Sequence, residues 1–220
     1  MGNESFDGGK SIPFMYTPKH NKEEDTEKLC AFMRAHSFAT LVTVKDHLPR
    51  ATHLPFIIET EDERVHLYAH MARANDQWRD FSTGRELLVI FQEPHAYVSP
   101  RHYETAQNVP TWNYVAVHLY GRAEVLEKKE EKLGLLERLI EAHDHDYFRR
   151  WKELPEDYIN SKLSGIVAFS IEASRMEGRF KLSQDRTLGE RESIIRELAA
   201  RPDGLAAETA ELMRRNPPRP

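Results

Sequence analysis

The stretch HMARANDQW, residues 70–78, follows directly on a strand-like run from Val65 to His70 and carries an arginine where a helix is expected to begin. A strand that passes at once into a helix start brings free backbone N–H groups and the positive end of the helix dipole together. The Arg73 guanidinium in the same turn can grip two phosphate oxygens. The stretch therefore predicts a site for a phosphate-bearing ligand, although a buried strand-to-helix corner with a surface arginine fits the same residues.

Runs rich in β-branched and aromatic residues surround this stretch and are separated by polar or proline-containing turns. They are residues 38–44, 51–58, 65–70, 86–92, 95–98 and 113–125, and a last run at 165–172 is expected to return to the sheet. Their close spacing predicts a mainly β (α+β) fold, an antiparallel barrel with flanking helices. We expect only one helix, opened by residues 72–78, to interrupt the sheet.

Four further helices are expected around the barrel. The first is expected to start at Asn21, with Glu24 as its capping partner, and to plug the barrel with an apolar stripe. A longer amphipathic helix is expected at 129–145, with Leu133, Leu136, Ile140 and His143 on one side. Thr187 and Glu190 form a capping box for a helix over 188–199, and the residues after Pro202 can form one more short helix.

Composition indicates one sizeable domain at 15–200, preceded by a polar extension or expression remnant at 1–14 and followed by a partly helical tail at 201–220. The chain has 220 residues, 40% of them hydrophobic, and a net charge of -5, which gives no sign of a nucleic-acid partner. The single cysteine, Cys30, excludes an internal disulfide and is expected in the core. No apolar run is long enough for a membrane span, and no secretion signal is present. We therefore expect a cytoplasmic protein without membrane contact.

Polar side chains occur within or beside the expected strands. Thr52 and His53 lie in the run ATHLP, where a barrel-rim ligand contact and a hydrogen-bonded core histidine are both open. Trp112 offers a flat face for stacking on a planar ring, although an aromatic residue at a subunit interface would look the same.

The sequence shows no nucleophile elbow, P-loop, HExxH or CxxC motif. The run HDHD at 143–146 lacks further ligands at metal-binding spacing and is interpreted as a solvated helix end. Bound flavin would explain the missing acid–base set, because the cofactor then supplies the redox reactivity.

Five ordered motifs carry a family resemblance. They are ATHLP (51–55), HMARANDQW (70–78), FQEPHAYVSPRHY (91–103), VPTWNYVAVHLYG (109–121) and GRFKLSQDR (178–186). Over about residues 15–200 the chain resembles the PaiB-type FMN-binding negative transcriptional regulators. The resemblance implies an FMN-binding split barrel, built as a homodimer with flavin sites in the clefts between subunits. More distantly, the chain resembles the pyridoxamine-phosphate oxidase and flavin reductase superfamily, in which a Ser-Arg-Lys turn holds the FMN phosphate. Here that turn reads Ala72-Arg73-Ala74, which leaves Arg73, Asn75 and backbone amides as the phosphate partners.

The resemblance also implies positions for the remaining site residues. Backbone groups of Thr52, His53 and Leu54 are expected at the isoalloxazine edge, His70, Met71 and Arg73 towards the phosphate, and Gln92 at the polar rim. Trp112 and Asn113 are expected to approach from the partner subunit. Lys181 and Gln184 either cap the cleft or form a polar turn before the last capped helix.

Several functions remain open on this sequence. The resemblance favours an FMN-dependent sensor or negative transcriptional regulator, yet contact with DNA rests on resemblance alone, because no helix-turn-helix or basic recognition helix is present. The alternatives are a flavin-dependent oxidoreductase acting on a small molecule, and a haem-binding or haem-degrading protein for which His102 and His118 are available.

Overall fold

The computed structural model describes residues 15–105 and 107–218, and eight strands there form one antiparallel sheet in the order β3-β2-β6-β7-β8-β5-β4, with β1 paired to β8. The strands are β1 Lys22–Glu23, β2 Phe38–Lys45, β3 Leu48–Pro55, β4 Ile57–Glu61, β5 Arg64–Ala72, β6 Leu87–Val98, β7 Thr111–Val125 and β8 Ile166–Lys181. The α-helices are α1 Thr26–Ala35, α2 Lys129–His143, α3 His145–Trp151, α4 Glu156–Ser164, α5 Leu188–Ala200 and α6 Gly204–Arg215, and the 3₁₀ helices are η1 Lys19–Asn21, η2 Asp76–Thr83 and η3 Pro100–His102. This is the antiparallel barrel with flanking helices that the sequence predicts. The predicted extension at 1–14 lies outside the described residues.

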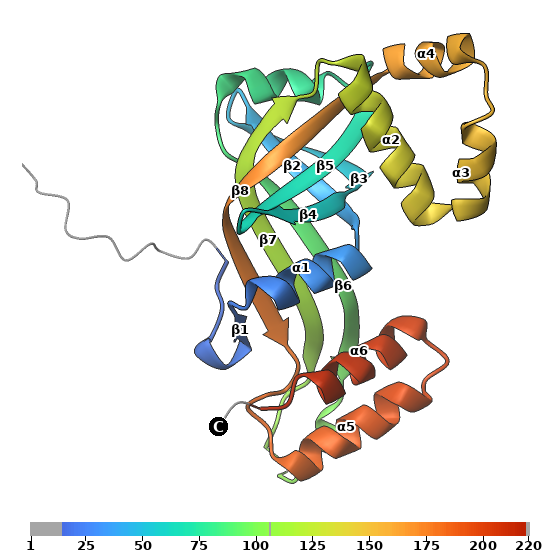
Figure 1. Ribbon diagram of the computed structural model, residues 1–220. Helices are drawn as coiled ribbons and strands as arrows, with labels where there is room; N and C mark the ends of the chain where they lie inside the picture. Colours follow the sequence, from blue (N-terminus) through green and yellow to red (C-terminus); the bar gives the residue numbers. More distant parts are fainter. Residues whose placement is uncertain (1–14, 106, 219–220) are drawn as a thin grey trace, which may run out of the picture.

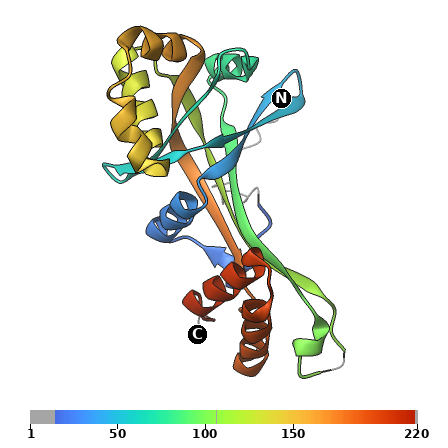
Figure 2. The ribbon, with the colours of Figure 1, turned by 90° about the vertical axis from the view of Figure 1, so that its right-hand side faces the viewer.

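Strands β6, β7 and β8 are the longest and run through the whole molecule. The central strand β7 is hydrogen-bonded to β6 over residues 111–121 and to β8 over 114–125. Helices α2–α4 lie at one end of these strands and α5 and α6 at the other, as Figures 1 and 2 show. The sheet therefore fixes the distance between two separate helical ends.

The core follows from strict alternation along the strands. In β5, Val65, Leu67, Ala69 and Met71 are buried while the residues between them are partly accessible, as expected for a strand with one face on the core. Helix α1 covers this core with Leu29, Cys30, Phe32 and Met33. The prediction that α1 plugs the barrel and that Cys30 is a core residue is confirmed.

The predicted start of α1 at Asn21 is wrong. The helix begins at Thr26, because the Asp25 carboxylate accepts hydrogen bonds from the backbone N–H groups of Glu27 and Lys28 and caps the first turn. The preceding residues are held by β8 instead, with Lys22 opposite Arg179. Strand pairing here overrides the local capping signal.

Four of the predicted runs are divided, merged or extended in the structure. The run 51–58 is divided at the buried Phe56, so that it belongs to both β3 and β4. The runs 86–92 and 95–98 are one strand, β6, with an irregularity between Gln92 and His95. The last run extends to Lys181, because β8 continues alongside the lower half of β7.

The helical segment between β7 and β8 differs from the single helix predicted. Helix α2 ends at His143, and α3 and α4 follow it. The buried residues of α2 are Leu135 and Leu139, which pack on Ala168 of β8. The predicted apolar stripe of Leu133, Leu136, Ile140 and His143 is therefore wrong. Because α2 meets the barrel along this narrow strip, its hydrophobic pattern is too weak to identify the buried face.

The C-terminal helices form part of the main core. The capping box of Thr187 and Glu190 is present at the start of α5, and the predicted last helix is α6. Buried Arg191 of α5 donates to the backbone carbonyls of Met213 (2.7 Å), Asn216 (3.1 Å) and Leu182. These bonds hold the end of α6 against α5, where Met213 is fully buried.

Two absences hold within residues 15–105 and 107–218. No helix there combines the length and apolar character needed to cross a bilayer. No three His, Cys, Asp or Glu side chains gather there as metal ligands, the run at 143–146 included.

Two glycines give a paired test of the packing. A Cβ at Gly121 of β7 would fall on the carbonyl oxygen of Glu172 in β8, whereas a Cβ at Gly134 of α2 would meet open space. We expect Gly121→Ala to lower the free energy of unfolding by about 1–3 kcal/mol through overpacking. Gly134→Ala is expected to raise it by about 0.5–1 kcal/mol through helix propensity. Denaturant unfolding measures both, and equal effects of the two substitutions would contradict this packing.

Candidate functional site

The turn after β5 differs from the sequence expectation in where its helix begins. Ala72 is still the last residue of β5, and η2 begins at Asp76. Asn75 is the cap, because its side-chain oxygen accepts from the backbone N–H of Gln77 at 3.1 Å. The expected helix start at Ala72 is therefore wrong, and Arg73 lies in the turn between strand and helix.

Arg73 is anchored at the junction between α4 and β8. Its Nε donates to the carbonyl of Ser164 at 2.9 Å, its Nη2 donates to that of Ile166 at 3.0 Å, and its backbone N–H bonds to Gly165. A guanidinium carries five N–H groups, so the Nη1 edge stays available for an anion. Ala72, Arg73 and Ala74 are all exposed, so this edge is presented at the surface.

Behind the turn lies a buried amide that the sequence reasoning missed. Gln77 is 1% exposed, and its Nε2 donates to Thr43 Oγ1 (3.1 Å) and to the carbonyl of Arg50 (3.2 Å). Its Oε1 accepts from the Thr52 hydroxyl, and the Asn75 amide nitrogen donates to the same hydroxyl at 2.9 Å. The network joins β2, β3 and η2. The only signal in the sequence was a glutamine two residues after Asn75.

The acidic side chains near the turn are paired with Arg50 and with Lys45, whose Nζ lies 4.0 Å from Asp76. Its guanidinium is paired with Asp76 and lies 3.5 Å from Asp80, which also accepts from Thr43 Oγ1 at 2.7 Å. The hydrogen bond from Arg50 lowers the pKa of Asp76. An anion at the turn therefore meets carboxylates that already have cationic partners.

The three predicted residues of β3 alternate across the strand. Thr52 belongs to the buried network and Leu54 is buried, whereas His53 is exposed and its Nδ1 lies 3.0 Å from Thr40 Oγ1. The strand thus presents the side chain of His53 on the outer face and holds Thr52 against the turn.

Met71 and His70 occupy opposite faces of β5. Met71 is buried in the core, and its side chain faces away from the exposed turn. His70 is half-buried, and burial lowers the pKa of its imidazole. His70 therefore contributes no charge towards a phosphate at neutral pH.

Trp112 and Asn113 lie at the end of β7 that is remote from the turn, and Gln92 lies near the middle of β6. Trp112 is 52% exposed and packs edge-on against Tyr97, and Gln92 is exposed on β6. Asn113 is fully buried, and its amide bonds to Ser183 Oγ at 3.0 Å and contacts Met213 within the same chain. The Asn113 side chain is thus committed to its own core, and of the pair only Trp112 presents a side chain outward.

Lys181 and Gln184 make the contacts of a polar turn. The Lys181 ammonium donates to the carbonyl of Trp112 at 2.8 Å and to the Thr111 hydroxyl. The Gln184 side chain accepts from the backbone N–H of Leu182 and donates to the carbonyl of Phe180. Both side chains therefore fasten the end of β8.

His102, considered above as a haem ligand, has both ring nitrogens engaged. Its Nδ1 lies 3.1 Å from Ser193 Oγ and its Nε2 is paired with Glu197. The Arg101 and Arg201 guanidinium groups also bond to Glu197. Partial burial raises the pKa of the Glu197 carboxyl, but these two arginines and His102 together lower that pKa to about 2. This cluster ties η3 to α5.

A groove of about 640 Å³ lies elsewhere, between the outer face of the barrel and α2. It is lined by Tyr68, Phe148, Arg138 and the glutamates at 131, 137 and 141. Arg138 is itself paired with Glu59. This excess of carboxylates disfavours a phosphate, so the turn at 73–75 is the better candidate.

The comparisons with known proteins agree with this class of site. Residues 15–175 match the family model described as "Putative FMN-binding domain". The chain belongs to this family of FMN-binding split-barrel proteins, which confirms the resemblance and makes FMN the cofactor of its family.

Individual relatives support the assignment. The chain is 39% identical over 201 residues to the Protease synthase and sporulation protein PAI 2 of Bacillus subtilis, which covers 90% of this chain and 96% of that protein. In structure it is similar to the flavocytochrome Anf3 from Azotobacter vinelandii, with a TM-score of 0.60 and 17% identity over 73% of this chain and 69% of that one. It is also similar to the FAD and heme binding protein from Mycobacterium smegmatis, with a TM-score of 0.57 and 18% identity over 73% of each chain. Because both identities are below 20%, these two structures support the fold of this chain and not a particular activity.

The buried imidazole predicts a pH dependence. Burial lowers the pKa of His70 in the folded protein, so the folded state favours the neutral imidazole. The contribution of His70 to the free energy of unfolding is present above the imidazole pKa of about 6.5 in the unfolded chain, and it is lost as the pH falls through the lower pKa of the folded state. Between pH 7.5 and 5.5 the melting temperature of wild type should fall further than that of His70→Gln. Thermal unfolding followed by circular dichroism measures the difference. Parallel pH profiles of the two proteins would contradict the assignment.

Proposed function

We propose that this protein is a homodimeric FMN-binding regulator that responds to small molecules through its flavin and does not read DNA directly. The observation that carries the proposal is the turn at 73–75, where anchored donors face outward beside neutralised carboxylates. Family membership and the PAI 2 relative support it. When bound, FMN supplies electron transfer, a reactivity that the side chains themselves lack.

The phosphate end of the flavin fits the turn. The Nη1 edge of Arg73 and the second hydrogen of the Asn75 amide are both available, and a phosphate is well matched by charge-assisted donors of this kind. Replacement of the superfamily's serine and lysine by Ala72 and Ala74 leaves these groups and the backbone amides to hold the anion.

In this proposal, the isoalloxazine ring of the flavin reaches Trp112 of a second copy of the chain. Trp112 and Val125 lie at opposite ends of β7, roughly 40 Å apart at about 3.3 Å per residue. Val125 marks the end near the turn, because it lies opposite Phe169, and the neighbouring Ala168 pairs with His70. Within one chain, a flavin at the turn cannot reach Trp112. Two antiparallel copies related by a two-fold axis would bring the turn of each to the tryptophan of the other.

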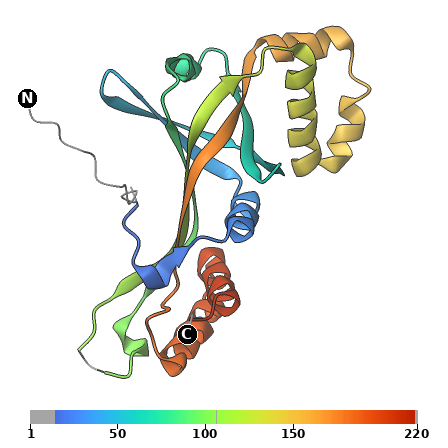
Figure 3. The same ribbon diagram turned by 60° about the vertical axis from the view of Figure 1, so that its left-hand side comes forward.

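The outer face of β6 and β7 is the surface that favours such pairing. Helices α1, α5 and α6 lie on one side of these strands in Figure 3, and among the described elements no α-helix covers the other. That face carries Ile90, His118 and Tyr114, all half-buried, and continues to the exposed Trp112. The adjoining residues of β8 on this face are Glu177 and Arg179, whose guanidinium lies over Tyr114. A face that combines aromatic and arginine side chains and carries no helix favours a subunit interface.

Direct reading of DNA is not supported by the charges. The net charge is -5, and the cations in contact with acidic partners include Arg50, Arg101 and Arg138. A DNA-binding surface needs clustered, available cations. Regulation through a small molecule bound or consumed at the flavin is physically simpler.

Removal of the Arg73 side chain should separate phosphate binding from ring binding. Loss of a charge-assisted hydrogen bond costs about 1.5–3 kcal/mol, so Arg73→Ala should raise the Kd for FMN roughly 10- to 100-fold. The Kd for riboflavin, which lacks the phosphate, should not change. Flavin fluorescence titration measures both constants.

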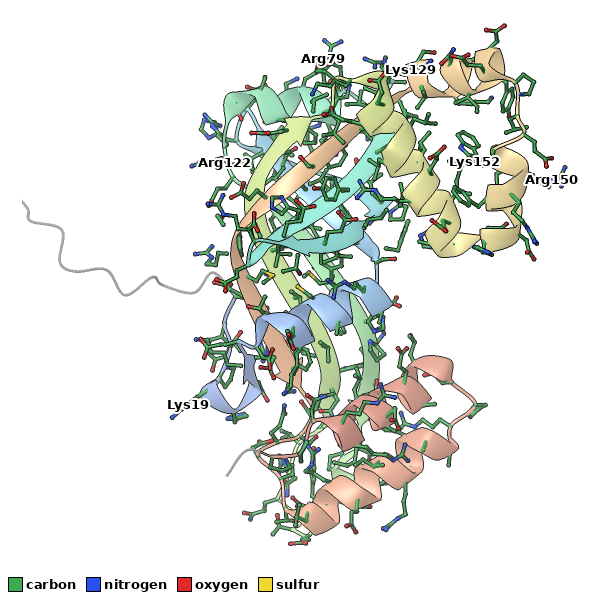
Figure 4. The ribbon with its side chains drawn as sticks, in the orientation of Figure 1. Lys19, Arg79, Arg122, Lys129, Arg150 and Lys152 are labelled. Atoms are coloured by element: carbon green, nitrogen blue, oxygen red, sulfur yellow. The ribbon has the colours of Figure 1, made fainter. Side chains whose placement is uncertain are left out.

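The matched control is Arg79→Ala. Arg79 lies on η2 and points away from the body of the molecule (Figure 4), with its guanidinium over Trp78. This variant should bind FMN like wild type. Unchanged FMN affinity in Arg73→Ala, or an equal loss of riboflavin, would contradict the phosphate site.

The proposed homodimer is tested at Ile90, on the outer face of β6. Analytical ultracentrifugation should give twice the chain mass of 25.6 kDa. Ile90→Glu, which places a charge between Thr40 and His118 on that face, should yield monomers and abolish FMN binding. A monomeric wild type that binds FMN would refute the shared site.

A further inference from the structure

Gln77 belongs to a ring of hydrogen bonds that includes the Asn75 amide of the turn. Three hydrogen bonds form a closed ring: the Gln77 backbone N–H donates to Asn75 Oδ1, Asn75 Nδ2 donates to the Thr52 hydroxyl, and that hydroxyl donates to Gln77 Oε1. Since each group has a defined role, the Asn75 amide cannot exchange its oxygen and nitrogen without breaking two bonds. The remaining Asn75 N–H therefore has one direction.

The ring is held from inside the barrel. Gln77 Nε2 donates to Thr43 Oγ1 and to the carbonyl of Arg50, which belong to the β2–β3 hairpin. Because Gln77 is almost fully buried, solvent does not compete for these bonds. The amide thus couples the hairpin to the turn, although its side chain does not reach the surface.

We infer that Gln77 is a positioning residue that gives this protein its selectivity for a phosphorylated flavin over the same ring without phosphate. The inference rests on the proposed function, in which the phosphate binds at residues 73–75. Gln77 acts through Asn75 and Thr52: it orients the amide before the ligand arrives, so that less conformational freedom is lost on binding.

Replacement of the amide by a side chain of similar length tests this role. Gln77→Met keeps the volume but removes the side-chain bonds to Thr43, Arg50 and Thr52. We expect its Kd for FMN to rise at least about tenfold while its Kd for riboflavin stays within about twofold of wild type. A purely structural role would weaken both flavins equally, because it would not distinguish the phosphate.

The matched control is Leu198→Ala, a buried large-to-small change in α5, at the opposite end of the long strands from the turn. It should lower the melting temperature but leave the ratio of the two Kd values unchanged. Thr52→Val breaks the same ring at its rim without touching the inner bonds of Gln77 and should reproduce the selective loss. It therefore provides the test if Gln77→Met does not fold.

The outcomes separate the two proposals. A wild type that binds neither flavin refutes the proposed function. A wild type that prefers FMN, with folded Gln77→Met and Thr52→Val variants that keep the same preference, refutes the positioning role alone. Equal weakening of FMN and riboflavin in both variants also overturns it.

Discussion

The continuous hydrogen bonding of β7 to both neighbours is the constraint on which the other elements depend. Pairing with β6 and β8 along almost its whole length carries the sheet beyond the barrel, where α5 and α6 pack. The same pairing holds the turn after β5 and the exposed Trp112 at opposite ends of a stiff unit. Under the proposed function, a flavin that uses both is shared between two copies that meet at the outer face of β6 and β7.

Two layers of polar contacts prepare the turn for an anion. In the inner layer, Gln77 joins η2 to the β2–β3 hairpin with bonds that water cannot replace. In the outer layer, Arg50 and Lys45 are paired with Asp76, and Arg50 also lies beside Asp80. Arg73 is held by the carbonyls of Ser164, at the end of α4, and Ile166, at the start of β8, so its free edge is fixed in place before any ligand binds. This arrangement offers charge and direction together, which the acidic groove beneath α2 does not.

Much of this fold was predictable from local pattern. The strands and the Thr187 capping box follow from periodicity and cap chemistry, and five ordered motifs identified the family and its cofactor. Two predictions were wrong because tertiary contacts override the local pattern. Pairing of Lys22 with β8 displaces the start of α1, and a narrow contact with Ala168 sets the buried face of α2. Asn113 and Gln77 show the same limit at the site, because sequence does not reveal which amide is buried.

A crystal structure of the protein grown with FMN tests the central claim most directly. The account predicts the phosphate within hydrogen-bonding distance of Arg73 and Asn75 of one copy, with the isoalloxazine ring beside Trp112 of the second. An FMN molecule held by one copy alone, or with its phosphate in the groove beneath α2, would contradict it.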